Sequence, residues 1–194
     1  MSEKNLVKIK HPTAASVCSG LELEGEALQL LTDATTPADY LSQLIEKELY
    51  PDAVRFLAGA LPKREATWWA CLSARKGLNE NSPATDSQAV QLAEAWVYKP
   101  TDENRTKALA AAEATRLKTS AGWAAMAAFW SGGNISPVEG TVVPPADELS
   151  GKAVVGAVML AAVQNGPEQV KSNYQCFLKQ GLDIAAGGDG RSVQ

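Results

Sequence analysis

Short helical segments, each opened by a capping residue and closed by proline or glycine, most constrain what this chain can fold into. From about residue 26 onward, apolar residues recur at spacings of three and four, whereas the alternation typical of strands nearly vanishes. Thr36 stands before Pro37 and Asp39, so a hydroxyl, a proline with a preset φ and an acid follow in the order that a helix start favours. A helix is therefore predicted to begin there.

Further helix starts follow along the chain. Leu61-Pro62-Lys63 opens a segment that is predicted to end at Gly77, and Thr101 and Thr119 each precede another. Two more starts are predicted from capping patterns. Residues 85–88 have the T-x-x-Q form of a capping box, and residues 149–150 resemble a hydrophobic staple followed by an N-cap serine.

Counting these segments gives about eight helices of 9–20 residues, and the fold class predicted is an all-α, single compact multi-helix bundle. The domain boundaries expected are an N-terminal arm over residues 1–25, a helical domain over 26–187 and a disordered tail over 188–194. Within the arm, residues 5–10 alternate apolar and charged side chains, so this piece is predicted as a short strand or an extended segment. Residues 134–145, with three prolines, form the longest linker.

Composition excludes several function classes. The chain has 194 residues, which suffices for one domain with a sizeable core, and 45% of them are hydrophobic. Its net charge of −4 argues against a basic face that tracks nucleic acid, so no nucleic-acid partner is expected. A single histidine and three cysteines exclude most multi-histidine and CxxC metal sites, and no cofactor or metal is expected.

The distribution of apolar stretches and cysteines along the chain predicts a cytoplasmic protein. The residues after Met1 contain no apolar stretch of signal-peptide length, and the longest apolar run, residues 153–163, is too short to span a bilayer. No membrane association is therefore expected. Cys18, Cys71 and Cys176 are odd in number and far apart, which favours a reducing compartment over a disulfide framework.

The adjacent tryptophans Trp68 and Trp69 are the strongest candidates for a binding surface. Neighbouring residues of a helix point about 100° apart, so one helix face rarely buries both rings. Either the helix is packed on two sides, or one ring lies at a surface groove as a binding anchor. Arg64, four residues before Trp68, is placed to stack on it, and Glu65 precedes Trp69 by the same spacing. These four residues form the candidate protein-binding site. The simpler alternative is that Arg64 and Glu65 are solvated residues of the first helix turn. The remaining tryptophans, Trp96, Trp123 and Trp130, follow apolar helix faces and are predicted core residues.

Catalytic equipment is sparse. A catalytic dyad or triad with a histidine base would need His11, which stands beside a proline in the least regular segment. The sequence contains no P-loop, no GxGxxG after a strand and no HExxH. Asp147-Glu148 lies before the apolar helix, where acids suit a positive helix end rather than a catalytic pair. No catalytic residue is assigned.

A set of short motifs gives the chain a family resemblance. The motifs, in chain order, are residues 61–66, 68–71, 95–97, 100–101, 111–114, 122–124, 129–133, 152–154 and 181–185. Together they resemble DUF6931, an alanine-rich bacterial family of unknown function. The family is associated with type VI secretion genes, so the resemblance implies an accessory, adaptor or effector-handling protein.

Three function hypotheses follow. The first is a non-enzymatic, chaperone-like protein-binding module that acts on a secretion component or its cargo, with homo-oligomers also open. The second is an immunity-type protein that neutralises a basic toxin through clustered acids, namely Glu22, Glu24, Glu26, Asp33 and Asp39. The third is an enzyme built on carboxylates that converge in a pocket.

Overall fold

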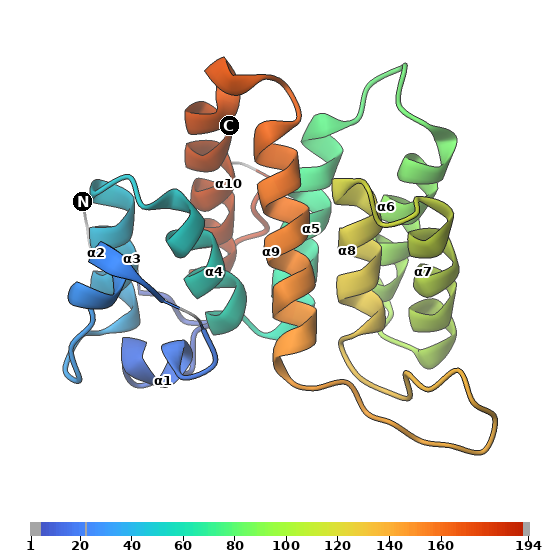
Figure 1. The fold of residues 1–194 in the computed structure, drawn as a ribbon, viewed down its shortest axis with the longest axis horizontal. Coiled ribbons are helices and arrows are strands. Elements are labelled where there is room, and N and C mark those ends of the chain that lie inside the picture. Colours follow the sequence, from blue (N-terminus) through green and yellow to red (C-terminus); the bar gives the residue numbers. More distant parts are fainter. Residues whose placement is uncertain (1–4, 22, 192–194) are drawn as a thin grey trace.

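The computed structural model describes residues 5–21 and 23–191 and is all-α over that part of the chain, with no strand (Figure 1). Eight of its helices are longer than one and a half turns, which confirms the predicted fold class. The elements are α1 (Ala14–Cys18), α2 (Gly25–Gln29), α3 (Pro37–Glu46), α4 (Tyr50–Ala60), α5 (Lys63–Gly77), α6 (Ala84–Tyr98), α7 (Asp102–Ala114), α8 (Ser120–Phe129), α9 (Glu148–Val163), the 3-10 turn η1 (Pro167–Gln169) and α10 (Val170–Ala185).

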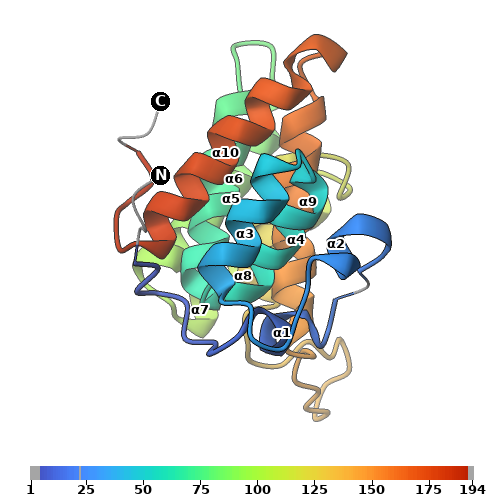
Figure 2. The same ribbon diagram turned by 90° about the vertical axis from the view of Figure 1, so that its left-hand side faces the viewer.

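Seven of the eight long helices form two layers (Figures 1 and 2). One layer runs α4, α9, α8 and α7, each packed on the next, and the other runs α10, α5 and α6. Between the layers, α5 packs against both α9 and α8, while α6 packs against α8 and α7. Helices α1 and α3 lie on the outer side of α4. The apolar helix α9 contacts four long helices and is therefore central.

Threonine caps set three of the helix starts as predicted. The hydroxyl oxygens of Thr36, Thr101 and Thr119 accept hydrogen bonds from backbone N–H groups in the first turns of α3, α7 and α8. Each bond satisfies a donor that the helix itself leaves unpaired, an arrangement worth about 1 kcal/mol per cap. Helix α5 also begins at Lys63 and ends at Gly77 as expected.

Two other predicted starts are wrong, because each helix begins before the residue that was predicted to cap it. Helix α6 begins at Ala84, so Thr85 lies inside the first turn and the predicted capping box does not form. Helix α9 begins at Glu148, which places Ser150 inside the helix as a fully buried residue. The Ser150 hydroxyl donates to the Ala127 carbonyl at 3.0 Å.

Buried hydroxyls join α8 and α9 reciprocally. Ser150 of α9 donates to α8 as described, and Ser120 of α8 donates to the Ala157 carbonyl of α9 at 2.8 Å. Both serines are buried, so each bond satisfies a polar group that would otherwise cost about 1–3 kcal/mol. Small residues along both helices permit this close approach.

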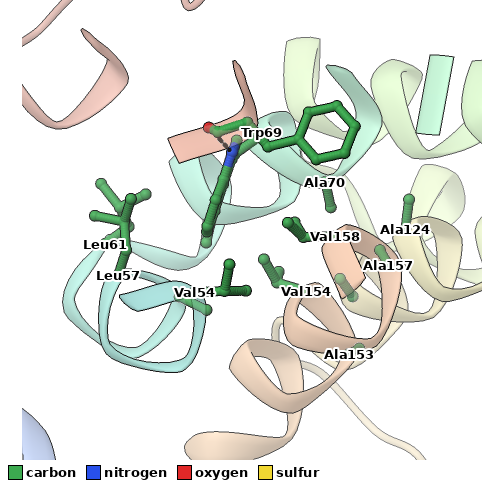
Figure 3. Close-up of a cluster of buried hydrophobic side chains, with 14 of the residues drawn as sticks. Val54, Leu57, Leu61, Trp69, Ala70, Ala124, Ala153, Val154, Ala157 and Val158 are labelled. Atoms are coloured by element: carbon green, nitrogen blue, oxygen red, sulfur yellow. Dashed lines mark hydrogen bonds between the residues drawn. The ribbon is translucent and has the colours of Figure 1, made fainter. Parts of the chain in front are cut away.

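Trp69 fills the centre of the core where α5 meets α10 (Figure 3). Its side chain is fully buried, and the indole Nε1–H donates to the Phe177 carbonyl of α10 at 2.7 Å. Gly181 leaves the space that the ring occupies. A Cβ at that position would lie 2.6 Å from Leu57 Cδ2 and 2.9 Å from Trp69 Cε2.

Both ends of the described chain pack on the helical domain. The N-terminal segment contains the short helix α1, and the Lys8 amide donates to the Ala185 carbonyl at the end of α10. Residues 188–191, expected in a disordered tail, lie against α5 and α10. The Gly188 amide donates to the Asp183 carbonyl at 2.8 Å. Residues 192–194 of the expected tail lie outside the described residues.

A buried arginine holds the long linker after α8. Arg105 of α7 is 4% exposed and donates to the carbonyls of Phe129 and Asn134, each at 3.1 Å, and to Asp102 Oδ1 at 2.7 Å. Its guanidinium also lies over the Phe129 ring, 4.8 Å from the centroid. These contacts satisfy the buried guanidinium, and through them Arg105 fixes the end of α8 and the start of the linker.

Within the described residues, no helix is long and apolar enough to cross a membrane.

Gly181 provides a test of this packing. Replacing it with alanine, Gly181→Ala, places a methyl group against the rigid Trp69 ring, and we expect a loss of about 1–3 kcal/mol in unfolding free energy. Gly59→Ala in α4 is the matched control, since its Cβ would meet Val17 Cγ1 at an ordinary 3.6 Å. That variant should gain up to about 1 kcal/mol from reduced chain entropy. Urea unfolding measures both, and equal stability of the two variants would contradict the packing argument.

Candidate functional site

The structure separates the two adjacent tryptophans. Trp69 points into the core, whereas Trp68 is half-buried at the surface of α5. The sequence left open whether the helix is packed on two sides or one ring lies at a surface groove. Helix α5 packs against α6, α8, α9 and α10, and Trp68 is nevertheless left half-buried. Trp69 is therefore unavailable to a partner, and of the two rings Trp68 is the candidate contact.

Arg64 and Glu65 have partners other than the tryptophans that their spacing suggested. The Arg64 Nε–H donates to the Val97 carbonyl at the end of α6, at 2.5 Å. Glu65 forms an ion pair with Lys8 of the N-terminal segment, at 2.9 Å. Both side chains thus tie α5 to neighbouring segments, and the predicted stacking of Arg64 on Trp68 is replaced by these bonds.

The cation over Trp68 comes from the other end of the chain. The Arg191 guanidinium carbon lies 4.8 Å from the Trp68 ring centroid, and Arg191 Nη2 donates to the Tyr98 hydroxyl at 2.7 Å. The Trp68 indole N–H donates to the Asp189 carbonyl at 2.7 Å. Tyr98 lies beside Trp68 with ring centroids 5.9 Å apart, and its side chain is 62% exposed. We call Trp68, Leu72 and Tyr98 the aromatic surface.

Sequence reasoning missed Tyr98 and Arg191 because they reach Trp68 only through tertiary folding. Tyr98 is the last residue of α6, and Arg191 is more than one hundred residues from Trp68 along the chain. The single available signal was that a tyrosine ends a helix directly before Lys99-Pro100. Such a signal does not identify a neighbour.

A large cleft lies on another side of the molecule. It measures about 1120 Å³ and is bounded by α1 and the segment after it, by α4, and by the first turns of α5 and α9. Small residues form part of its lining, with Gly59 and Gly151 where α4 approaches α9. His11 lines the cleft, which carries charges of both signs on Glu24, Asp52, Arg55, Lys63, Asp147, Glu148 and Lys152.

Most of the acids in this cleft are paired with cations. Asp52 pairs with Arg55 at 2.9 Å, and Asp147 pairs with Lys63 at 3.2 Å. Glu148 lies 3.9 Å from Lys152. Three of the four acids that line the cleft therefore lie beside a cation of the same cleft.

His11 is close to a hydroxyl in the cleft, but the geometry does not activate a nucleophile. Its Nδ1 is 3.5 Å from Ser16 Oγ. The Ser16 hydroxyl donates instead to the Thr13 carbonyl at 2.6 Å, a bond within the turn that starts α1. Because the serine proton is already committed to a backbone oxygen, the histidine is not positioned to remove it.

Other chemistry-bearing groups are dispersed. Among the described residues, no group of three histidine, cysteine or acidic side chains could hold a metal ion. The acids proposed for toxin binding have separate surroundings, since Glu24 lines the cleft, Glu26 pairs with Lys47 and Asp39 bonds to Thr36. Asp33 is exposed, and Glu22 lies outside the described residues.

The three tryptophans predicted as core residues have different burial. Trp96 is buried at 7% exposure, as predicted. Trp123 and Trp130 are half-buried on the outer face of α8, with ring centroids 6.3 Å apart. Trp123 rests against Gly156 of α9, where a Cβ would meet its ring at 3.2 Å. Trp123 therefore covers part of α9 without being fully enclosed.

Comparison with known proteins identifies the class. Residues 40–185, three quarters of the chain, match the family of unknown function DUF6931. The chain therefore belongs to the DUF6931 family, as its motifs indicated. No curated protein and no solved structure matches it.

The two tryptophans should differ sharply in their contribution to stability. Trp69→Phe removes a buried hydrogen bond and leaves a cavity, so we expect a loss of about 2–4 kcal/mol in unfolding free energy. Trp68→Phe at the aromatic surface should cost about 1 kcal/mol or less. Denaturant unfolding of both variants measures the difference, and a larger cost for Trp68→Phe would refute the assignment of Trp69 to the core.

The three cysteines should differ in their reactivity toward thiol reagents, because two of them are buried and one is half-buried. Burial raises the pKa of the Cys18 thiol to about 11 and raises that of Cys71 further, whereas Cys176 is half-buried beside Lys76. The thiolate is the reactive form, so at pH 8 a thiol reagent such as DTNB should modify Cys176 in the native protein. Cys18 and Cys71 should react after unfolding. Cys176→Ser should abolish the native-state reaction, and a remaining fast phase would contradict the burial of the other two.

Proposed function

We propose that this chain is a non-enzymatic protein-binding module and that its partner binds the aromatic surface. The observation that carries the proposal is the pair of neighbouring rings at the end of α6 and on α5. Trp68 is half-buried and Tyr98 is 62% exposed, with no apolar layer over the tyrosine within the described residues. Tryptophan and tyrosine are enriched among the residues that contribute most of the binding energy at protein interfaces.

The biological setting that we propose is bacterial type VI secretion. The family that the chain's motifs resemble is associated with type VI secretion genes. In that setting the module would act in the cytoplasm as an accessory, an adaptor or an effector-handling protein. The proposal is compatible with the net charge of −4, which does not favour binding to nucleic acid.

Two alternatives rest on weaker observations. An immunity-type protein would need the acidic residues of α2 and α3 to act together, but Glu26 and Asp39 are engaged with Lys47 and Thr36. A carboxylate-based enzyme would use the cleft, whose acids Asp52 and Asp147 are paired with cations. We therefore favour the binding module over both.

Affinity purification from the native host tests this proposal. The tagged wild-type chain is compared with a Trp68→Ala/Tyr98→Ala double variant, in which Trp69 is retained because it belongs to the core. Val163→Ala on α9 is the matched control, since Val163 is likewise exposed, at 48%, but lies outside the aromatic surface. We expect a stoichiometric partner with the wild type and the control, and at least tenfold less with the double variant, about 1.4 kcal/mol or more of binding energy.

Circular dichroism confirms that the double variant is folded before its binding is compared. A folded double variant that retains the partner at wild-type stoichiometry would overturn the assignment of the binding surface. Capture that is lost equally in the control would show that the effect is general and not due to the aromatic surface.

A further inference from the structure

The aromatic surface already holds a short peptide, because the chain's own C-terminal segment lies on it. We call residues 187–191 the C-terminal segment. Three different contacts hold it, namely a backbone hydrogen bond from Trp68, a buried glycine and a stacked arginine. Each contact selects a different chemical feature of the bound segment.

The backbone contact sets the direction of the segment. The Trp68 indole N–H donates to the Asp189 carbonyl, and the next amide, that of Gly190, donates to Asp183 Oδ2 at 3.0 Å. Both groups of the bound segment that are used here belong to the main chain. The Asp189 side chain contributes within the segment itself, where its Oδ1 accepts a hydrogen bond from the Arg191 amide at 3.0 Å.

The second contact selects glycine. Gly190 is buried and has a φ of +71°, a conformation that side chains rarely adopt. A Cβ on Gly190 would lie 2.8 Å from Leu72 Cδ1 and 3.0 Å from Ile184 Cδ1. Any larger residue at this position would strain the backbone, and the ends of the Leu72 and Ile184 side chains would have to shift to make room for it.

The third contact selects arginine. The planar guanidinium of Arg191 lies over the Trp68 ring and donates to the Tyr98 hydroxyl. Stacking on a ring combined with a directed hydrogen bond suits guanidinium better than the ammonium of lysine. The two rings that form the proposed binding surface are thus the same two that hold Arg191.

The segment is attached in a way that permits exchange. Gly187, Gly188 and Gly190 make up most of it, and Gly187 also has a positive φ of 98°. Glycine loses more conformational freedom on ordering than any other residue, so ordering this piece has a high entropic cost. The three contacts hold it with the help of its covalent attachment, which gives it an effective concentration on the order of millimolar.

We propose that the aromatic surface recognises a glycine–arginine segment of a partner protein, and that the chain's own Gly190-Arg191 occupies the site in competition with it. This inference rests on the proposed function, since it uses the same surface. It adds the chemistry of the partner, a flexible segment in which arginine follows glycine. The chain thereby masks its own binding surface until such a segment displaces the C-terminal segment.

Purified components suffice for the test. Gly190→Val in the full chain should release the C-terminal segment, and Gly132→Val is the matched control because nothing lies within 4 Å of a Cβ at that position. The probe is a synthetic peptide with the sequence of residues 186–194, added to the nitrogen-15-labelled protein. The indole N–H resonance of Trp68, assigned with Trp68→Phe, reports whether its hydrogen bond to the segment is present.

We expect the Trp68 resonance to shift in the Gly190→Val chain and to return toward its wild-type position as the peptide binds. The wild-type and Gly132→Val chains should bind the same peptide at least about tenfold more weakly, because their own segment competes at its effective concentration. A peptide with lysine in place of Arg191 should bind the Gly190→Val chain at least about fivefold more weakly than the arginine peptide.

Arg191→Ala is the second releasing variant, in case Gly190→Val does not fold, because its side chain is exposed. Equal binding of the arginine and lysine peptides would overturn the proposal, as would a released segment with no peptide binding at millimolar concentration. If the wild-type chain dimerises as its concentration rises, the site would be assigned to the segment of a second copy of the chain. That result would overturn the choice of a different partner protein. Host capture that fails while the peptide binds would contradict the proposed function alone.

Discussion

The contact of Trp69 with α10 is the constraint on which the rest of the structure depends. The indole fills the space left by Gly181 and donates its one hydrogen to the Phe177 carbonyl. A large ring with a single polar atom satisfies its packing and its hydrogen bond in very few orientations. This contact therefore fixes both the rotation of α5 about its axis and the distance between α5 and α10.

The position of the binding surface follows from that rotation. Once Trp69 points inward, the neighbouring Trp68 must point about 100° away, toward the side where α6 and the end of α10 meet α5. Tyr98 ends α6 at this place, and the chain that leaves α10 passes over it. A core contact thus places the aromatic surface and the segment that covers it, without any residue of that surface taking part in the core contact.

Local sequence predicted the helices well where the capping side chain has no competing partner. Thr36, Thr101 and Thr119 bond to their own first turns, so the local pattern and the final structure agree. Ser150 was misassigned because a buried carbonyl on α8 takes its hydroxyl. For the candidate site, sequence singled out Trp68 but gave Arg64 as its cation, because helical spacing describes neighbours on one helix and carries no information about Arg191.

The sequence by itself determined the helix class, most helix boundaries and the family, because these depend on the order of neighbouring residues. It also determined that one of the two adjacent tryptophans would be hard to bury on a single face. Tertiary structure alone decided which ring is buried, which cation covers the other and where the mixed-charge cleft opens. Those outcomes depend on contacts between segments many residues apart, whose geometry is set by the packing of whole helices rather than by any local pattern.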